Sequence, residues 1–88
     1  MTYRDRNEII SQILESARAG GITKTRIMYK AYLSYDQLEE YLVLLIENDL
    51  LRYDSPMHKF KTTEKGLAFL QAYNQIDQIL KEHDNLSK

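Results

Sequence analysis

The stretch that decides the fold runs from residue 23 to residue 50 and reads TKTRIMYKAYLSYDQLEEYLVLLIENDL. It contains two amphipathic helical patterns joined by only a few residues around Ser34. Thr23 is placed to cap a helix over about residues 24–32, because its hydroxyl can accept from a backbone N–H of the first turn. Ser34 and Gln37 form a capping box at the start of the next helix. The stretch therefore predicts two helices with a tight turn between them.

Further elements flank these two helices. A helical stripe of apolar residues predicts an earlier helix over about residues 5–19, which Gly20 stops because glycine readily adopts a positive φ. The helix that follows Ser34 is expected to end near Asn48 and Asp49, since these residues tolerate the left-handed conformation better than most. All 88 residues are expected to form one folded unit.

Two short alternating runs, 51–53 and 59–62, flank a polar gap that contains Pro56. They predict a β-hairpin with Phe60 facing inward and its lysine neighbours facing out. Thr63 is then expected to cap a long last helix. Apolar residues of that helix fit a seven-residue frame, with Phe69, Ile76 and His83 at one seam position and Ala72, Ile79 and Leu86 at the other.

The order helix, helix, helix, hairpin, helix is the layout of a winged helix–turn–helix DNA-binding domain. The chain resembles small archaeal winged helix–turn–helix proteins over about residues 5–83. The segments that carry the resemblance are residues 23–34, 41–51 and 60–66. One departure is Asp49, which stands where these proteins usually place Gly.

The resemblance implies a mainly α fold with a small β-hairpin, of class α+β. It implies a winged helix–turn–helix domain over residues 1–62 and a C-terminal dimerisation helix over residues 63–88. This last helix would pair with a second copy as an antiparallel coiled coil. The residues expected at the dimer contact are Phe69, Ala72, Tyr73, Ile76, Ile79, Leu80 and His83.

Charge along the chain is uneven although the net charge is only −1. Residues 34–50 hold five acidic and no basic residues, and a recognition helix of this charge would repel phosphates. Residues 1–33 carry +3 and residues 51–66 carry +2, which places positive charge before and after the acidic helix. The pattern disfavours indiscriminate coating of DNA and leaves room for selective binding that relies on residues 24–32 and the hairpin.

Contacts to DNA are expected from the helix–turn–helix and from the hairpin, or wing. The predicted residues are Lys24, Arg26, Ser34, Tyr35, Gln37, Arg52, His58, Lys59 and Lys61. Tyr35 is expected either to contact DNA or to pack against the wing, Gln37 to read adenine or to serve the capping box, and His58 to enter a minor groove or to remain an exposed turn residue. The other tyrosines considered, Tyr29, Tyr32, Tyr53 and Tyr73, are expected at the edge of the core.

Several function classes find no support in the sequence. There is no Cys, no Gly-rich phosphate loop and no nucleophile set that contains His, so we expect no enzyme, no cofactor and no metal. The longest aliphatic run, residues 42–46, is too short to cross a membrane, and we expect a cytoplasmic, nucleoid-associated protein. The predicted function is a homodimeric transcriptional regulator that binds double-stranded DNA. The alternative is a protein-interaction module whose acidic helix docks a basic partner.

Overall fold

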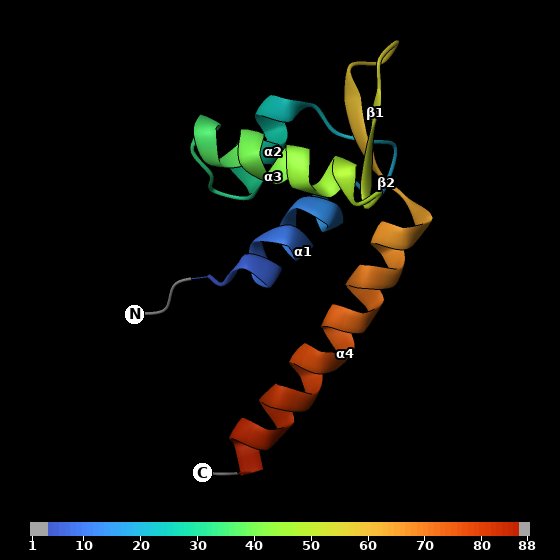
Figure 1. Ribbon diagram of the computed structural model, residues 1–88. Helices are drawn as coiled ribbons and strands as arrows, with labels where there is room; N and C mark the ends of the chain where they lie inside the picture. The colour runs from blue at the N-terminus through green and yellow to red at the C-terminus, as the bar shows by residue number, and fades with distance from the viewer. Residues whose placement is uncertain (1–3, 87–88) are drawn as a thin grey trace.

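A computed structural model describes the backbone of residues 4–86 and the side chains of residues 4–80. Within that part of the chain, four helices and one hairpin follow one another in the predicted order (Figure 1). Their bounds are α1 Arg6–Ser16, α2 Lys24–Lys30, α3 Tyr35–Glu47, β1 Leu51–Asp54, β2 Lys59–Thr62 and α4 Glu64–Leu86. The first three helices and the hairpin gather at one end, and α4 runs away from them. This arrangement confirms the predicted winged-helix fold.

Three hydroxyl side chains begin three of the helices, as the sequence predicts. Thr23 Oγ1 accepts from the backbone N–H of Arg26 at 3.4 Å, and Thr63 Oγ1 accepts from that of Gly66 at 3.0 Å. Ser34 and Gln37 form the complete capping box, with bonds of 3.2 and 3.0 Å between each side chain and the other residue's backbone N–H. Such caps typically contribute about 1 kcal/mol each.

The hydrophobic core lies between α1, α2, α3 and the base of the hairpin. Leu70 brings α4 into it, and α1 packs along the first part of α4. The largest fully buried side chains are Ile13, Leu14, Ile27, Leu38, Leu45 and Leu51. The predicted helical stripes therefore form the core.

Helix α1 ends at Ser16, three residues before the expected end, for a reason that lies far along the chain. The backbone N–H of Thr62 donates to the Ala17 carbonyl at 3.1 Å, and the Thr62 hydroxyl donates to the Leu14 carbonyl at 2.6 Å. These bonds satisfy carbonyls that a helix end leaves without partners. Strand β2 thus closes the helix.

Helix α2 ends at Lys30, two residues before the expected end. The guanidinium of Arg4 donates to the carbonyls of Ala31 and Tyr32, which places a cation at the C-terminus of the helix. Tyr32 itself has φ 54°, in the left-handed region. The expected place of Tyr29 and Tyr32 at the core edge is wrong, since they are 71% and 83% exposed.

The hairpin pairs Leu51 with Thr62 and Tyr53 with Phe60 in antiparallel register. A third extended segment, which the sequence did not reveal, adds to its edge: Ile22 and Phe60 exchange backbone hydrogen bonds of 2.9 and 2.8 Å. Gly21 makes this approach possible, because it has φ 85° and a Cβ there would lie 3.0 Å from Lys61 Cγ. The Gly-Gly pair thus brings an extended segment to the edge of the wing, and the expected stop of α1 at Gly20 is wrong, because the helix already ends at Ser16.

The junction between hairpin and α4 is also a close backbone approach. Asp49 adopts the left-handed conformation with φ 60°, as expected, and its carbonyl accepts from the Thr63 hydroxyl at 2.6 Å. The Leu50 carbonyl accepts from the Thr63 N–H at 3.1 Å, and a Cβ on Gly66 would lie 2.3 Å from that oxygen. The end of α3 is therefore tied to the first turn of α4.

Helix α4 extends well past the rest of the fold, and the molecule measures 50 × 28 × 20 Å along its principal axes (Figure 1). Its outer part exposes apolar side chains, including Ile76, Ile79 and Leu80 at 57–63%. No helix in the described range is long and apolar enough to span a membrane.

Candidate nucleic-acid interface

The N-terminal turn of α3 presents Ser34, Tyr35 and Gln37 beside the start of α2. The side-chain amide oxygen of Gln37 and the Ser34 hydroxyl accept the two hydrogen bonds of the capping box, so they fix the start of the helix. Tyr35 is exposed, and it lies against Lys24 of α2 rather than against the wing. The tight turn therefore brings the first turn of α2 and the first turn of α3 together.

Lys24, Tyr35 and Glu39 form a cluster across α2 and α3, which we call the Lys24 cluster. Lys24 Nζ forms an ion pair with a Glu39 carboxylate oxygen and donates to the Tyr35 hydroxyl at 3.2 Å. The same ammonium lies 4.8 Å from the centre of the Tyr35 ring, within the range of a cation–π contact. No local pattern predicts this arrangement, because Lys24 and Glu39 are fifteen residues apart in sequence.

The ionisation of this cluster follows from its contacts. The hydrogen bond with Glu39, followed by that with Tyr35, raises the pKa of Lys24 above its usual value. Hydrogen bonds from Lys24 and then Tyr35 lower the pKa of the Glu39 carboxyl. Both shifts favour the charged forms, so the ion pair is present at neutral pH.

The remaining surface of α3 is acidic and partly apolar. Asp36, Glu40 and Glu47 are exposed, and α3 carries no Lys or Arg. Val43 and Ile46 are also exposed, at 53% and 43%. Donors for base edges or phosphates are therefore scarce along this helix beyond its first turn.

The hairpin has two faces of different chemistry. Tyr53 and Phe60 pair across the strands with ring centres 4.8 Å apart, and with Ile46 they line a groove beside α3. Because side chains alternate along a strand, Arg52, Lys59 and Lys61 lie on the opposite face, which we call the basic wing face.

The basic side chains of the basic wing face differ in solvent exposure and in ion pairing. Lys61 Nζ lies 3.4 Å from Asp54 Oδ2, and both side chains are largely covered. Arg52 is exposed and Lys59 is half-buried. Lys59 and Lys61 flank Gly21, so the segment that pairs with the edge of β2 lies next to both lysines. Arg52 is therefore the most exposed cation of this face, and Lys61 already has a carboxylate partner.

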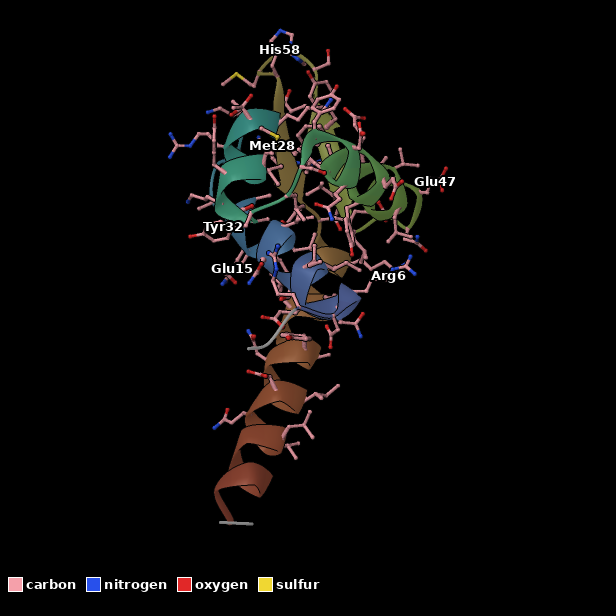
Figure 2. All side chains as sticks on the ribbon, turned by 90° about the vertical axis from the view of Figure 1, so that its left-hand side faces the viewer. Arg6, Glu15, Met28, Tyr32, Glu47 and His58 are labelled. Carbon is pink, nitrogen blue, oxygen red and sulfur yellow. The ribbon has the colours of Figure 1, made fainter. Side chains whose placement is uncertain are left out.

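His58 occupies the tip of the hairpin, at the end of the molecule opposite α4 (Figure 2). It has φ 55°, and its Nδ1 lies 3.0 Å from the Tyr53 hydroxyl. The imidazole thus folds back onto the aromatic face of the wing. No cluster of three or more His, Cys, Asp or Glu in the described residues is arranged to hold a metal ion.

The nine predicted DNA-contact residues thus fall into separate groups. Ser34, Tyr35 and Gln37 lie with Lys24 at the starts of α2 and α3, and Arg26 is exposed on α2. Those of the wing are divided between its tip and its basic face. Glu39, which the sequence assigned only to an acidic surface, proves to be the partner of Lys24.

The residues expected at a dimer contact differ in how far they are buried within the single chain. Phe69 packs partly against the core, and its ring stacks with that of Tyr73 at 6.4 Å. Burial raises the pKa of Tyr73, and nearby Glu8 raises it further. Ala72, Ile76, Ile79 and Leu80 are exposed. His83 lies within α4, but its side chain is outside the described residues.

Comparison with known proteins gives a consistent result. A family model described as winged helix-turn-helix matches residues 3–81. The uncharacterized protein MJ0287 of Methanocaldococcus jannaschii is 31% identical over 77 residues, which are 88% of this chain and 77% of that protein. MJ0290 of the same organism, also uncharacterized, is 27% identical over 77 residues, covering 88% of this chain and only 36% of that protein.

A solved structure is similar over nearly the whole chain. It is the crystal structure of Sso10a-2, a DNA-binding protein from Sulfolobus solfataricus, with a TM-score of 0.71 and 25% sequence identity. The similarity covers 96% of this chain and 86% of that chain, so it includes α4 as well as the helix–turn–helix and the hairpin.

Proposed function

Because the chain belongs to the winged helix-turn-helix family, we propose that it binds double-stranded DNA. One observation carries the proposal: α3 and the hairpin lie side by side. Helix α3 is capped and follows a tight turn, and the hairpin has one basic face. In helix–turn–helix proteins the second helix enters the major groove, and basic side chains nearby contact phosphates. The similarity to a DNA-binding archaeal protein supports it.

The charge map indicates which elements would hold the DNA. The exposed α3 surface is acidic, so we place most phosphate contacts on Arg26 of α2 and on Arg52 and Lys59 of the basic wing face. Only the first turn of α3 would approach base edges. A net charge of −1 also favours a selective regulator of transcription over a coating protein.

The test is a titration of labelled duplex DNA at 50 and 200 mM salt, followed by sequencing of genomic fragments that the protein retains. We expect measurable affinity that falls steeply with salt, since each phosphate contact contributes about 0.9 to the slope of log K against log salt. Retained fragments should share a sequence. Absence of binding at 50 mM salt would contradict the proposal.

We propose further that two copies pair through α4. Its outer part exposes Ile76, Ile79 and Leu80 on a helix that projects from the fold, and such a surface is stabilised when a second helix covers it (Figure 1). An antiparallel pair would place two winged-helix units at opposite ends.

The mass of the protein in solution tests this pairing. The unchanged protein should have the mass of a dimer, and the double variant Ile76→Asp, Ile79→Asp should have that of a monomer. Gln75→Asp with Gln78→Asp is the control with equal added charge.

A second candidate function rests on the groove between α3 and the wing. Ile46, Tyr53 and Phe60 line it, and the acidic side chains of α3 lie along its border. A partner segment with alternating apolar and basic residues would match this surface. This function is favoured if no DNA binding is found even at low salt.

A further inference from the structure

The Lys24 cluster brings a cation and a hydroxyl donor onto one carboxylate at the surface. Lys24 comes from the first turn of α2, Tyr35 from the first turn of α3, and Glu39 from the next turn of α3. The ammonium makes three contacts: the ion pair with Glu39, the 3.2 Å hydrogen bond to Tyr35, and the approach to its ring at 4.8 Å. The side chain of Lys24 is therefore held in one direction.

The groups that surround the Glu39 carboxylate are those that proteins present to phosphates. Lys ammonium and Tyr hydroxyl groups are common donors to the phosphate oxygens of DNA. Exposed fractions of 37% for Lys24 and 39% for Glu39 leave the ion pair open to solvent and to a ligand. A carboxylate oxygen thus occupies a position in which a phosphate oxygen would find the same partners.

We propose that Lys24 and Tyr35 form a phosphate-binding pair that Glu39 occupies from within the chain, so that this carboxylate withholds Lys24 from DNA. The proposal rests on the proposed DNA-binding function and adds an internal competitor to it. It accounts for a positive charge in the first turn of α2 that contacts a helix with no basic residue of its own. Exposed ion pairs contribute little to folding stability, so the main effect of Glu39 falls on binding.

Glu39→Gln tests the proposal, with Glu40→Gln as the matched control. Both substitutions remove one negative charge from neighbouring positions of α3, but only Glu39 pairs with Lys24. Affinity for a labelled 20-base-pair duplex is measured between 50 and 200 mM salt. We expect Glu39→Gln to add one phosphate contact and to steepen the salt slope by about 0.9. Between 50 and 200 mM salt, this variant should therefore lose affinity by a factor about 3.5 times larger than the unchanged protein does. Glu40→Gln should leave the slope unchanged.

Lys24→Ala, alone and combined with Glu39→Gln, completes the test. In the otherwise unchanged protein it should alter the slope little, because Lys24 is already engaged, whereas in the Glu39→Gln background it should abolish the gain. Equal slopes for Glu39→Gln and Glu40→Gln, with DNA binding retained, would overturn this inference and leave the proposed function intact. No binding by any variant at 50 mM salt would overturn both.

Discussion

Helix α3 and the β1–β2 hairpin lie side by side, and they differ in charge and in what holds them. Helix α3 is acidic, and its start is fixed by the Ser34–Gln37 capping box, whose two residues are close in sequence. One face of the hairpin is basic, and the hairpin is fixed by segments distant in sequence, including Ile22 and the end of α1. The start of the helix expected to read DNA is thus held by residues close in sequence. The position of the hairpin, which supplies positive charge, depends on contacts made by the rest of the fold.

The largest effect is expected where the hairpin meets α4. Gly66→Ala should destabilise the fold by about 2 kcal/mol, since a Cβ would lie 2.3 Å from the Leu50 carbonyl oxygen. Helix propensity alone predicts the opposite sign, a gain of up to about 1 kcal/mol. Urea denaturation measures the difference. Gly20→Ala is the control, because a Cβ there meets nothing within 4 Å and only its φ of 73° opposes the change. A stabilised Gly66→Ala protein would refute the close approach.

This contrast also explains how much of the fold could be predicted. The caps of Thr23, Ser34 and Thr63 are short-range patterns, so the starts of three helices were predicted correctly. The ends of α1 and α2 were placed too late because they depend on Thr62 and Arg4, which are distant in sequence. The extended segment at Ile22 was missed for the same reason. The residues around Gly20-Gly21 contain no local pattern that predicts pairing with β2.

The sequence predicted which kinds of residue lie at the candidate site better than it predicted which of them contact one another. Alternation along the strands correctly separated Phe60 from its lysine neighbours. The pairing of Lys24 with Glu39 required two helices to be packed in space, so the sequence could not reveal it. Tyr32 was misplaced because α2 ends at Lys30 and because Tyr32 has a positive φ, so its side chain does not continue the apolar stripe of the helix.

The next largest effect concerns DNA binding by the basic wing face. Lys59→Ala should reduce the salt slope by about 0.9 and weaken binding, since it removes one phosphate contact. Lys61→Ala should have a smaller effect, because Asp54 already pairs with that ammonium. Titration of duplex DNA at several salt concentrations measures both. Lys65→Ala, which removes an exposed lysine of α4 outside the proposed interface, is the control. Equal slopes for all three variants would argue against the wing as a phosphate-binding element.

The local contribution to the start of α3 can be tested at its N-cap residue, Ser34. Ser34→Ala should destabilise the protein by about 1 kcal/mol, because the Gln37 N–H loses its acceptor and the capping box is broken. The midpoint of urea denaturation should fall with little change in the slope. Ser55→Ala in the polar turn of the hairpin serves as the control for a Ser side chain that caps no helix. Equal losses in the two variants would count against the role of the box.

The smallest expected effect is a change in the pKa of Glu39, the residue of the acidic helix that contacts Lys24 of α2. Its pKa in the folded protein lies below the ordinary glutamate value, so the ion pair is complete above that value. It is lost as the pH falls through the lowered pKa, because protonation removes the charge that Lys24 contacts. A carboxyl-detected NMR titration should show this low pKa, and Lys24→Met should raise it. If Lys24→Met leaves the Glu39 titration unchanged, the cluster does not hold in solution and α3 is as acidic as its sequence indicates.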